Sequence, residues 1–206
     1  MKKIVLNTLD IGNIDGSEKY EYQSFQNIVL DNLNNVAFHN CLFSHVEFHN
    51  EEITKVSFYN CIIESSDFSN ANLSETGFVN VEIKETKLVG CDFTESYLKD
   101  TYIHDSILNY SIFYETNLKN VHFINNKMLD ISINSAKINN LILDNDDLTS
   151  SSFMNVNLNG VNVSTSNISK IMIDLKSLEG LIVNEMQAIM LSHLLKIRIE
   201  GEEWKL

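Results

Sequence analysis

Apolar residues recur at every fifth position over most of this chain, with polar residues between them. From Ile28 to Leu178 the fifth positions are 31 residues, and all of them are apolar. Two places before most of these centres stands a small or moderate residue, such as Cys41, Ser66 or Thr101. The period continues without an insertion or a gap.

No simple helix or strand explains a period of five. On an α-helix five residues advance about 500°, so successive centres would share no face. On a flat strand an odd period places every second centre on the opposite side. A chain that turns a corner every five residues, always in the same direction, points each centre and the residue two places before it inward. Stacked turns then pair at ~4.8 Å, which predicts an all-β solenoid.

The repeating unit resembles that of the pentapeptide-repeat family. Its pattern, A-(D/N)-L-x-x, is nearly reproduced at Ser66-Asp67-Phe68, Ala71-Asn72-Leu73, Cys91-Asp92-Phe93 and Thr116-Asn117-Leu118. The resemblance covers residues 26–178 and implies a right-handed quadrilateral β-helix with four repeats per turn. The 31 centres would then form about eight coils, a rod of roughly 36 Å.

Four sides per turn would stack residues that are 20 apart. This predicts an inward column of Phe38, Phe58, Phe78, Leu98, Leu118, Ile138, Leu158 and Leu178. It also predicts an outward column of Asn40, Asn60, Asn80, Asp100, Asn120 and Asn140. Because Asn tolerates the left-handed backbone region, the outward column indicates a corner, where stacked amides could bond to one another.

The two ends of the chain do not follow the period. Apolar residues in 1–25 are out of register, so we expect an irregular N-terminal cap there, followed by the β-helix over 26–178 and a C-terminal helix and tail over 179–206. Such caps keep a solenoid from associating through its open edges.

The C-terminal segment predicts a helix that begins after Asn184, with Gln187 placed for a capping box. We expect it to cover the last coil and also to form a homodimer interface, with exposed apolar surface at Leu191, Leu195 and Trp204 and a short strand at Ile197 and Ile199. The expected dimerisation residues are Met186, Ile189, Met190, Leu191, Leu194 and Leu195.

The same tail resembles the C-terminal segment of a subgroup of this family, the Qnr and MfpA proteins. The matching residues are Leu178, Gly180, Gln187, Ala188, Leu191, Leu194 and Ile197. In that subgroup the helix joins two β-helices end to end, and members bind bacterial type II topoisomerases. They are proposed to imitate duplex DNA, and some protect gyrase from quinolones.

Because the repeats here carry no inserted loop, the chain is closer to the loop-free MfpA-like members, and drug protection is a separate expectation from binding.

The charge balance is strongly acidic, with 28 acidic and 15 basic residues and a net charge of −13. Such a chain repels nucleic acid and can attract a basic surface. Over 36 Å, B-DNA carries about 21 phosphates, roughly twice the net charge of residues 26–178. A solvated outer face would explain these acids equally well. The candidate contact residues are a row of Glu75, Glu95 and Glu115, a second row of Glu85 and Asp105, and Asp100 between them.

The chain lacks the usual signatures of catalysis. We find no phosphate-binding loop, nucleophile elbow or metalloprotease motif, and we expect neither a cofactor nor a metal. The three cysteines occupy inward slots and predict inert free thiols in a cytoplasmic protein. No apolar stretch is long enough to span a membrane.

Three functional hypotheses remain. The first is a dimeric DNA mimic that binds DNA gyrase or topoisomerase IV, modulates the enzyme and protects it from fluoroquinolones or topoisomerase toxins. The second is an acidic scaffold with an unrelated protein partner. The third is an enzyme or metal protein that uses Cys41 and Cys61, which are 20 apart and therefore stacked.

Overall fold

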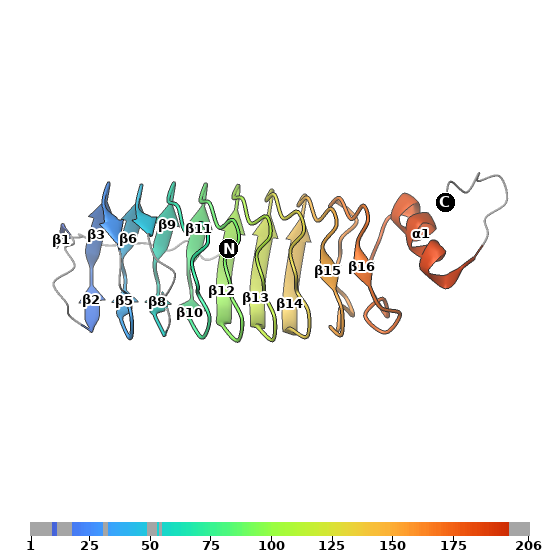
Figure 1. Cartoon of the computed structure of the whole chain (residues 1–206), viewed down its shortest axis with the longest axis horizontal. Helices are drawn as coiled ribbons and strands as arrows, with labels where there is room; N and C mark the ends of the chain where they lie inside the picture. The colour runs from blue at the N-terminus through green and yellow to red at the C-terminus, as the bar shows by residue number, and fades with distance from the viewer. Residues whose placement is uncertain (1–9, 12–17, 31–32, 49–52, 54, 198–206) are drawn as a thin grey trace.

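The chain winds into a straight stack of turns that ends in one short helix (Figure 1). The structure is a computed structural model, and it describes residues 10–11, 18–30, 33–48, 53 and 55–197. The predicted β-solenoid is confirmed, and the C-terminal helix lies at one end of the stack.

The strands are short because each side of a turn holds only five residues. The first nine are β1 (Asp10–Ile11), β2 (Lys19–Glu21), β3 (Gln23–Gln26), β4 (Val29–Leu30), β5 (Ala37–His39), β6 (Leu42–Ser44), β7 (Glu47–Phe48), β8 (Ser57–Tyr59) and β9 (Ile62–Glu64). The remaining seven are β10 (Gly77–Val79), β11 (Glu82–Lys84), β12 (Tyr97–His104), β13 (Asn117–Ile124), β14 (Lys137–Asp144), β15 (Ser152–Phe153) and β16 (Met172–Ile173).

All strand pairs in the described part of the chain are parallel. From β5 onward, each pair joins residues 20 apart, as Phe58 and Phe78 or Leu98 and Leu118 do. Phe38 and Leu178 are 140 positions apart, which corresponds to seven turns of 20. Because β12, β13 and β14 each continue round a corner, two neighbouring faces join into one 12-stranded sheet.

Left-handed backbone geometry forms the corners. The angle φ is positive at every fifth residue from Lys55 to Gly160, with values near 55° at most of the non-glycine positions. Each such residue redirects the chain without a proline or an insertion. The predicted corner every five residues is confirmed, and the corners define four outer edges.

The predicted Asn column lies along one of these edges. The side-chain amide Nδ2 of Asn80 donates to Oδ1 of Asn60 at 2.7 Å, and Asn120 donates to Asp100 at the same distance. Asn60 with Asn40 and Asn140 with Asn120 continue the ladder. An Asp100 carboxylate has no N–H to donate to Asn80, so the ladder is interrupted at that point.

The inside of the solenoid is a buried apolar core rich in phenylalanine. Of the 31 predicted centres, all are buried except Ile28, Ile138 and Leu178, which are partly buried against the same core. Phenylalanines stack in columns, with ring centroids 5.1 Å apart for Phe58 and Phe78. Such stacking adds to the stabilisation from burial alone.

Polar residues in the second inward slot are bonded to the backbone. The Thr76 hydroxyl donates to the carbonyl of Ile53 at 3.1 Å, and Thr116 donates to Phe93 at 2.8 Å. In each case the acceptor lies 23 residues earlier, on the neighbouring turn. This recurring bond offsets the cost of burying a hydroxyl.

The coils begin N-terminal to residue 26, within the segment expected to be an irregular cap. Strands β2 and β3 pair with β5 and β6 at an offset of 18, and Tyr20 and Phe25 are buried. Leu30 and Leu33 are both buried although only three residues separate them, so this turn is two residues shorter. Ile28, the first predicted centre, is therefore displaced from the inward column. Residues 1–9 and 12–17 of the expected cap lie outside the described residues.

The final side of the solenoid is a helical turn. Oδ1 of Asp174 accepts the amide N–H of Ser177 at 2.9 Å, and the Asp174 carbonyl accepts that of Leu178 at 3.3 Å. Oδ2 accepts the amide of Asn155 at 2.6 Å, and these backbone donors lower the pKa of Asp174 to about 2. As a result, Ser177 is buried and Lys176 is exposed.

Helix α1 (Glu185–Ser192) and the 3-10 helix η1 (His193–Leu195) complete the fold. The predicted capping box is present, since Asn184 and Gln187 bond to each other's backbone N–H at 2.9 Å. The Gln187 amide also donates to the carbonyls of Val163 and Ser166 at 2.9 and 2.8 Å, which attaches the helix to the last coil. No helix within the described ranges is long and apolar enough to cross a membrane.

Candidate partner-binding surface

All six acidic residues singled out from the sequence occupy corners of the solenoid. Each has a positive φ, and five are exposed while Asp100 is half-buried. The residues are Glu75 (φ 55°), Glu85 (50°), Glu95 (57°), Asp100 (50°), Asp105 (53°) and Glu115 (53°). Their placement on outer edges follows directly from the five-residue period.

Three of these acids form a single row on one edge, here called the Glu row (Glu75, Glu95 and Glu115). The amide of Glu75 donates to the residue just before Glu95, and the amide of Glu95 donates to the residue just before Glu115. These bonds place the three residues on successive turns, about 4.8 Å apart along the axis. Lys55 precedes the Glu row on the same edge, also with positive φ.

The second predicted row, Glu85 and Asp105, lies two corners away, with Asp100 on the corner between. His104 bridges two acids here, with Nδ1 2.8 Å from Oδ2 of Asp105 and Nε2 3.2 Å from Oε1 of Glu82. The hydrogen bond to His104 lowers the pKa of Asp105. The sequence analysis did not include His104 or Glu82 in this cluster.

Lysines interrupt the acidic surface. Lys99 and Lys119 are register partners on the face between the Glu row and the Asn column. Elsewhere Lys84 pairs with Glu64 at 2.8 Å and Lys87 with Asp67 at 3.1 Å. The two acidic rows are thus separated by a basic pair, which the 20-residue spacing of Lys99 and Lys119 could have indicated.

The cysteines lie in the core. Cys41, Cys61 and Cys91 are buried and free, and burial raises the pKa of Cys91 to about 12. Sγ of Cys61 donates to the Phe38 carbonyl at 3.4 Å, as the hydroxyls in this slot do. In the part of the chain that the structure describes, no three His, Cys, Asp or Glu side chains are grouped as metal ligands. This geometry gives Cys41 and Cys61 a packing role.

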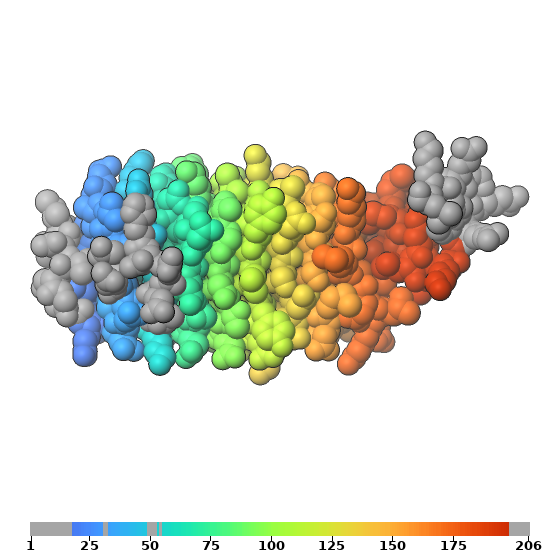
Figure 2. All heavy atoms as spheres, in the orientation of Figure 1, coloured from blue at the N-terminus to red at the C-terminus, as the bar shows by residue number. Residues whose placement is uncertain are grey.

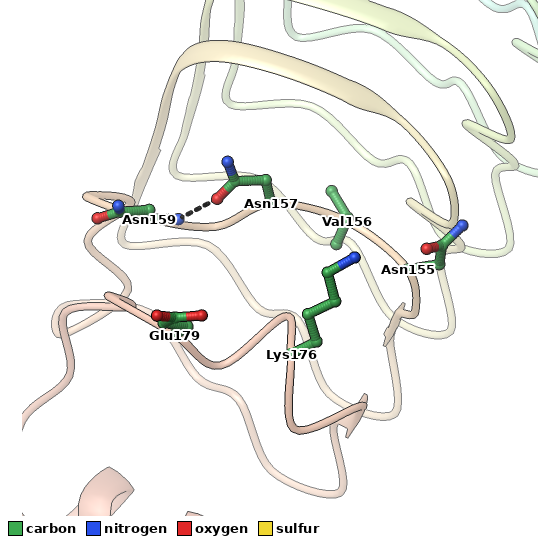
Figure 3. Close-up of a pocket in the computed structure, with 6 residues that line it drawn as sticks. All are labelled: Asn155, Val156, Asn157, Asn159, Lys176 and Glu179. Carbon is green, nitrogen blue, oxygen red and sulfur yellow. Dashed lines mark hydrogen bonds between the residues drawn. The ribbon is translucent and has the colours of Figure 1, made fainter.

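A polar pocket of about 460 Å³ opens where the helical turn at 174–178 replaces a flat side (Figure 3). Its lining residues are Asn155, Val156, Asn157, Asn159, Lys176 and Glu179. Oδ1 of Asn157 accepts the amide of Asn159 at 3.0 Å, so it is already used in a local turn. The lining consists mainly of side-chain amides, with Lys176 and Glu179 as its charged groups and no pair of carboxylates.

The expected dimerisation residues differ in exposure, and only some of them are on the surface. Leu191, predicted to be exposed, is buried against the last coil, and Ile189 and Met190 are partly buried. Met186, Leu194 and Leu195 are exposed, and Ile197 is exposed outside any strand. These four residues belong to α1, η1 and the two positions that follow η1, the segment that Figure 2 shows in red at one end of the rod. Ile199 and Trp204 lie outside the described residues.

Comparison with known protein families agrees with the repeat pattern. The family described as a pentapeptide repeat region matches residues 31–113, and no curated protein matches the chain. Among solved structures, trypsin-treated QnrB1, a plasmid-mediated fluoroquinolone resistance protein, is 13% identical with a TM-score of 0.45, covering 88% of this chain and 99% of its own. HetL from Nostoc sp. strain PCC 7120, involved in heterocyst differentiation regulation, is 14% identical with a TM-score of 0.28, covering 81% and 90%. The pentapeptide-repeat model thus matches residues 31–113, and the corners at every fifth residue continue the same five-residue geometry to Gly160.

Proposed function

We propose that this protein binds a bacterial type II topoisomerase, DNA gyrase or topoisomerase IV, and modulates it by imitating DNA. The Glu row carries the proposal, because it presents carboxylates at regular short intervals along a straight rod. Asp100 lies on the next corner and Glu85 and Asp105 on the one after it, as further acids beyond the Lys99 and Lys119 pair. A cytoplasmic protein of this charge repels DNA itself and favours the basic surface that holds DNA.

The tail supports the same proposal, since its resemblance to Qnr and MfpA proteins extends to Gln187. In this chain that residue attaches α1 to the last coil. Protection of the enzyme from a fluoroquinolone is a separate part of the proposal and needs its own measurement.

The decisive experiment is a supercoiling assay with purified gyrase from a low-GC bacterium, with and without a fluoroquinolone. The native protein is expected to inhibit supercoiling in the absence of drug. The double variant Glu95→Lys/Glu115→Lys is expected to inhibit about tenfold less, because it opposes positive charge to a basic surface. Lys is compatible with these corners, since Lys55 occupies the same edge at φ 57°.

The matched control is Asp130→Lys/Glu179→Lys, which changes the net charge equally at exposed acids away from the Glu row. If both double variants lost inhibition equally, the net charge of the protein would explain the effect, and the proposed contact surface would be contradicted. If the native protein neither inhibited gyrase nor bound it, the result would contradict the proposal and favour a scaffold with another partner.

We also propose that the protein forms a homodimer through its C-terminal helix. Met186 is 72% exposed, and Leu194, Leu195 and Ile197 are exposed with it. Apolar side chains gathered at one end of an acidic rod favour burial against a second copy. End-to-end association also keeps the acidic sides of the two rods apart.

Light scattering tests the dimer. The native protein is expected at twice its chain mass of 23.6 kDa, and Met186→Glu is expected at 23.6 kDa. Met172→Glu is the control, because Met172 is 53% exposed on β16, on the side of the rod. A monomeric native protein, or dissociation in both variants, would contradict the proposed interface.

A further inference from the structure

A groove runs along the edge that carries the Glu row. It has a volume of about 730 Å³ and crosses four successive turns, roughly 14 Å along the axis. Its lining residues are Glu95, Ser96, Tyr97, Tyr114, Glu115, Asn117, Ser135, Lys137 and Asn155. The groove therefore contains two members of the Glu row together with two tyrosines.

The tyrosines come from the two faces that meet at this edge. Tyr97 begins β12 on one face, and Tyr114 lies on the other face immediately before Glu115. Both rings are exposed, and Tyr110 and Ile112 continue the exposed apolar surface along the same side of the turn. Exposed tyrosines beside a groove are typical of protein contact surfaces.

The acceptors that an occupant of the groove can reach are carboxylates. Ser96 is buried, and its hydroxyl Oγ has no hydrogen-bond partner. Its neighbours in the inward slot, Thr76 and Thr116, both bond to a carbonyl of the next turn. Because this inward hydroxyl is shielded from solvent, the exposed carboxylates of Glu95 and Glu115 are the acceptors that an occupant of the groove can reach.

We propose that this groove receives an arginine side chain from an extended, basic segment of a protein partner. A guanidinium can lie flat against a phenol ring while its N–H groups donate to the Glu95 and Glu115 carboxylates. A lysine ammonium gives the charge but not the flat surface or the fork of donors. The inference rests on the proposed function for its choice of surface, and it names the chemistry of the partner at that surface.

Charge decides between the possible occupants. Nucleic acid would bring phosphates against Glu95 and Glu115, and a second copy of this chain would add another net charge of −13. Lys137 lines the end of the groove beyond Glu115 and opposes a cation there. Lys137 lies one turn beyond Glu115, which leaves the space between Glu95 and Glu115, beside Tyr97 and Tyr114, as the site for the guanidinium.

Titration with peptides, followed by NMR of the tyrosine rings, tests the groove without any topoisomerase. A capped tetra-arginine peptide is expected to bind several-fold more tightly than a capped tetra-lysine peptide. The double variant Tyr97→Leu/Tyr114→Leu is expected to bind the arginine peptide about fivefold more weakly and to lose the preference. Lys137→Met, which removes an opposing charge, is expected to bind it more tightly.

The control Tyr22→Leu/Tyr59→Leu removes two exposed tyrosines from other turns and is expected to leave binding unchanged. Equal binding of the two peptides, or an unaltered preference in Tyr97→Leu/Tyr114→Leu, would overturn the inference. Persistent arginine preference alongside a failed gyrase assay would support the groove and count against the topoisomerase as its partner.

Discussion

At pH 8 the variant Asp146→Asn is expected to be more stable than the native protein, by up to about 4 kcal/mol. Asp146 occupies an inward slot and is buried between Asn126 and Ser166 of the neighbouring turns. Burial raises the pKa of its carboxyl to about 7, and the nearby Asp144 carboxylate adds to the shift. Around neutral pH the folded protein therefore holds Asp146 either as a buried carboxylate or as a protonated carboxyl, and both forms cost free energy.

The bonding of this column explains why a neutral group is preferred. Oδ1 of Asp146 accepts the backbone N–H of Asn126 at 2.8 Å and its Nδ2 at 3.0 Å, while Oδ2 has no partner. Asn126 Nδ2 donates to the carbonyl of Ile103, 23 residues earlier, at 2.9 Å. Oδ2 of Asp146 occupies the equivalent position one turn later, where a donor would bond to the carbonyl of Phe123, 23 residues earlier. A protonated carboxyl or an asparagine amide supplies that donor, and a carboxylate does not.

The sign of the pH dependence follows from the raised pKa. Below pH 3.8 the carboxyl is protonated in both states, so its full contribution is present. Between pH 3.8 and about 7 the unfolded chain ionises first, and the stability from Asp146 is lost as pH rises through this window. Urea unfolding at pH 4, 6 and 8 should show a difference between Asp146→Asn and native that is small at pH 4 and grows toward pH 8.

The exposed corner acid Asp130 provides the control. Asp130→Asn removes the same charge from a solvated position, so its difference from native should change little with pH. A difference for Asp146→Asn that stays constant from pH 4 to pH 8 would contradict the account of a buried proton.

Most of the solenoid could be predicted because one period controls both packing and turning. A large centre every fifth residue requires a corner every fifth residue, and the spacing of 20 predicts that Glu75, Glu95 and Glu115 form one row; their φ angles place that row on an edge. The Asn column followed for the same reason. Residues on one edge are equally spaced in sequence, and such sets are easily found.

Features that depart from the period could not be predicted in this way. Ile28 and Leu30 are both apolar and equally suited to an inward position. The hydrophobic pattern therefore does not reveal that the turn joining β2 and β3 to β5 and β6 has 18 residues instead of 20. Tyr97 and Tyr114 line the same groove from two sides of a corner although they are 17 positions apart, a spacing that the 20-residue period does not bring together. In α1 most residues are apolar, so the sequence could not decide that Leu191 rather than Met186 faces the last coil.

Phe58→Ala is expected to destabilise the N-terminal coils by about 3–5 kcal/mol. Phe58 is fully buried, with ring centroids 5.4 Å from Phe38 and 5.1 Å from Phe78 in nearly parallel stacks, and edge-on to Phe43 at 5.6 Å. Neighbouring turns hold these rings by backbone pairing, so they cannot close in fully to fill the space. The variant therefore loses both the burial of the ring and its aromatic contacts.

The one-dimensional architecture determines where the loss is felt. Each turn contacts only its neighbours, so a cavity at Phe58 uncouples β5 and β6 from the rest of the stack while β13 and β14 keep their pairing. Hydrogen exchange should become faster in β5 and β6 and stay slow in β13. Ile138→Ala, in the same column but only partly buried, should cost less. Uniformly faster exchange along the whole rod would instead mean that the solenoid unfolds as one cooperative unit.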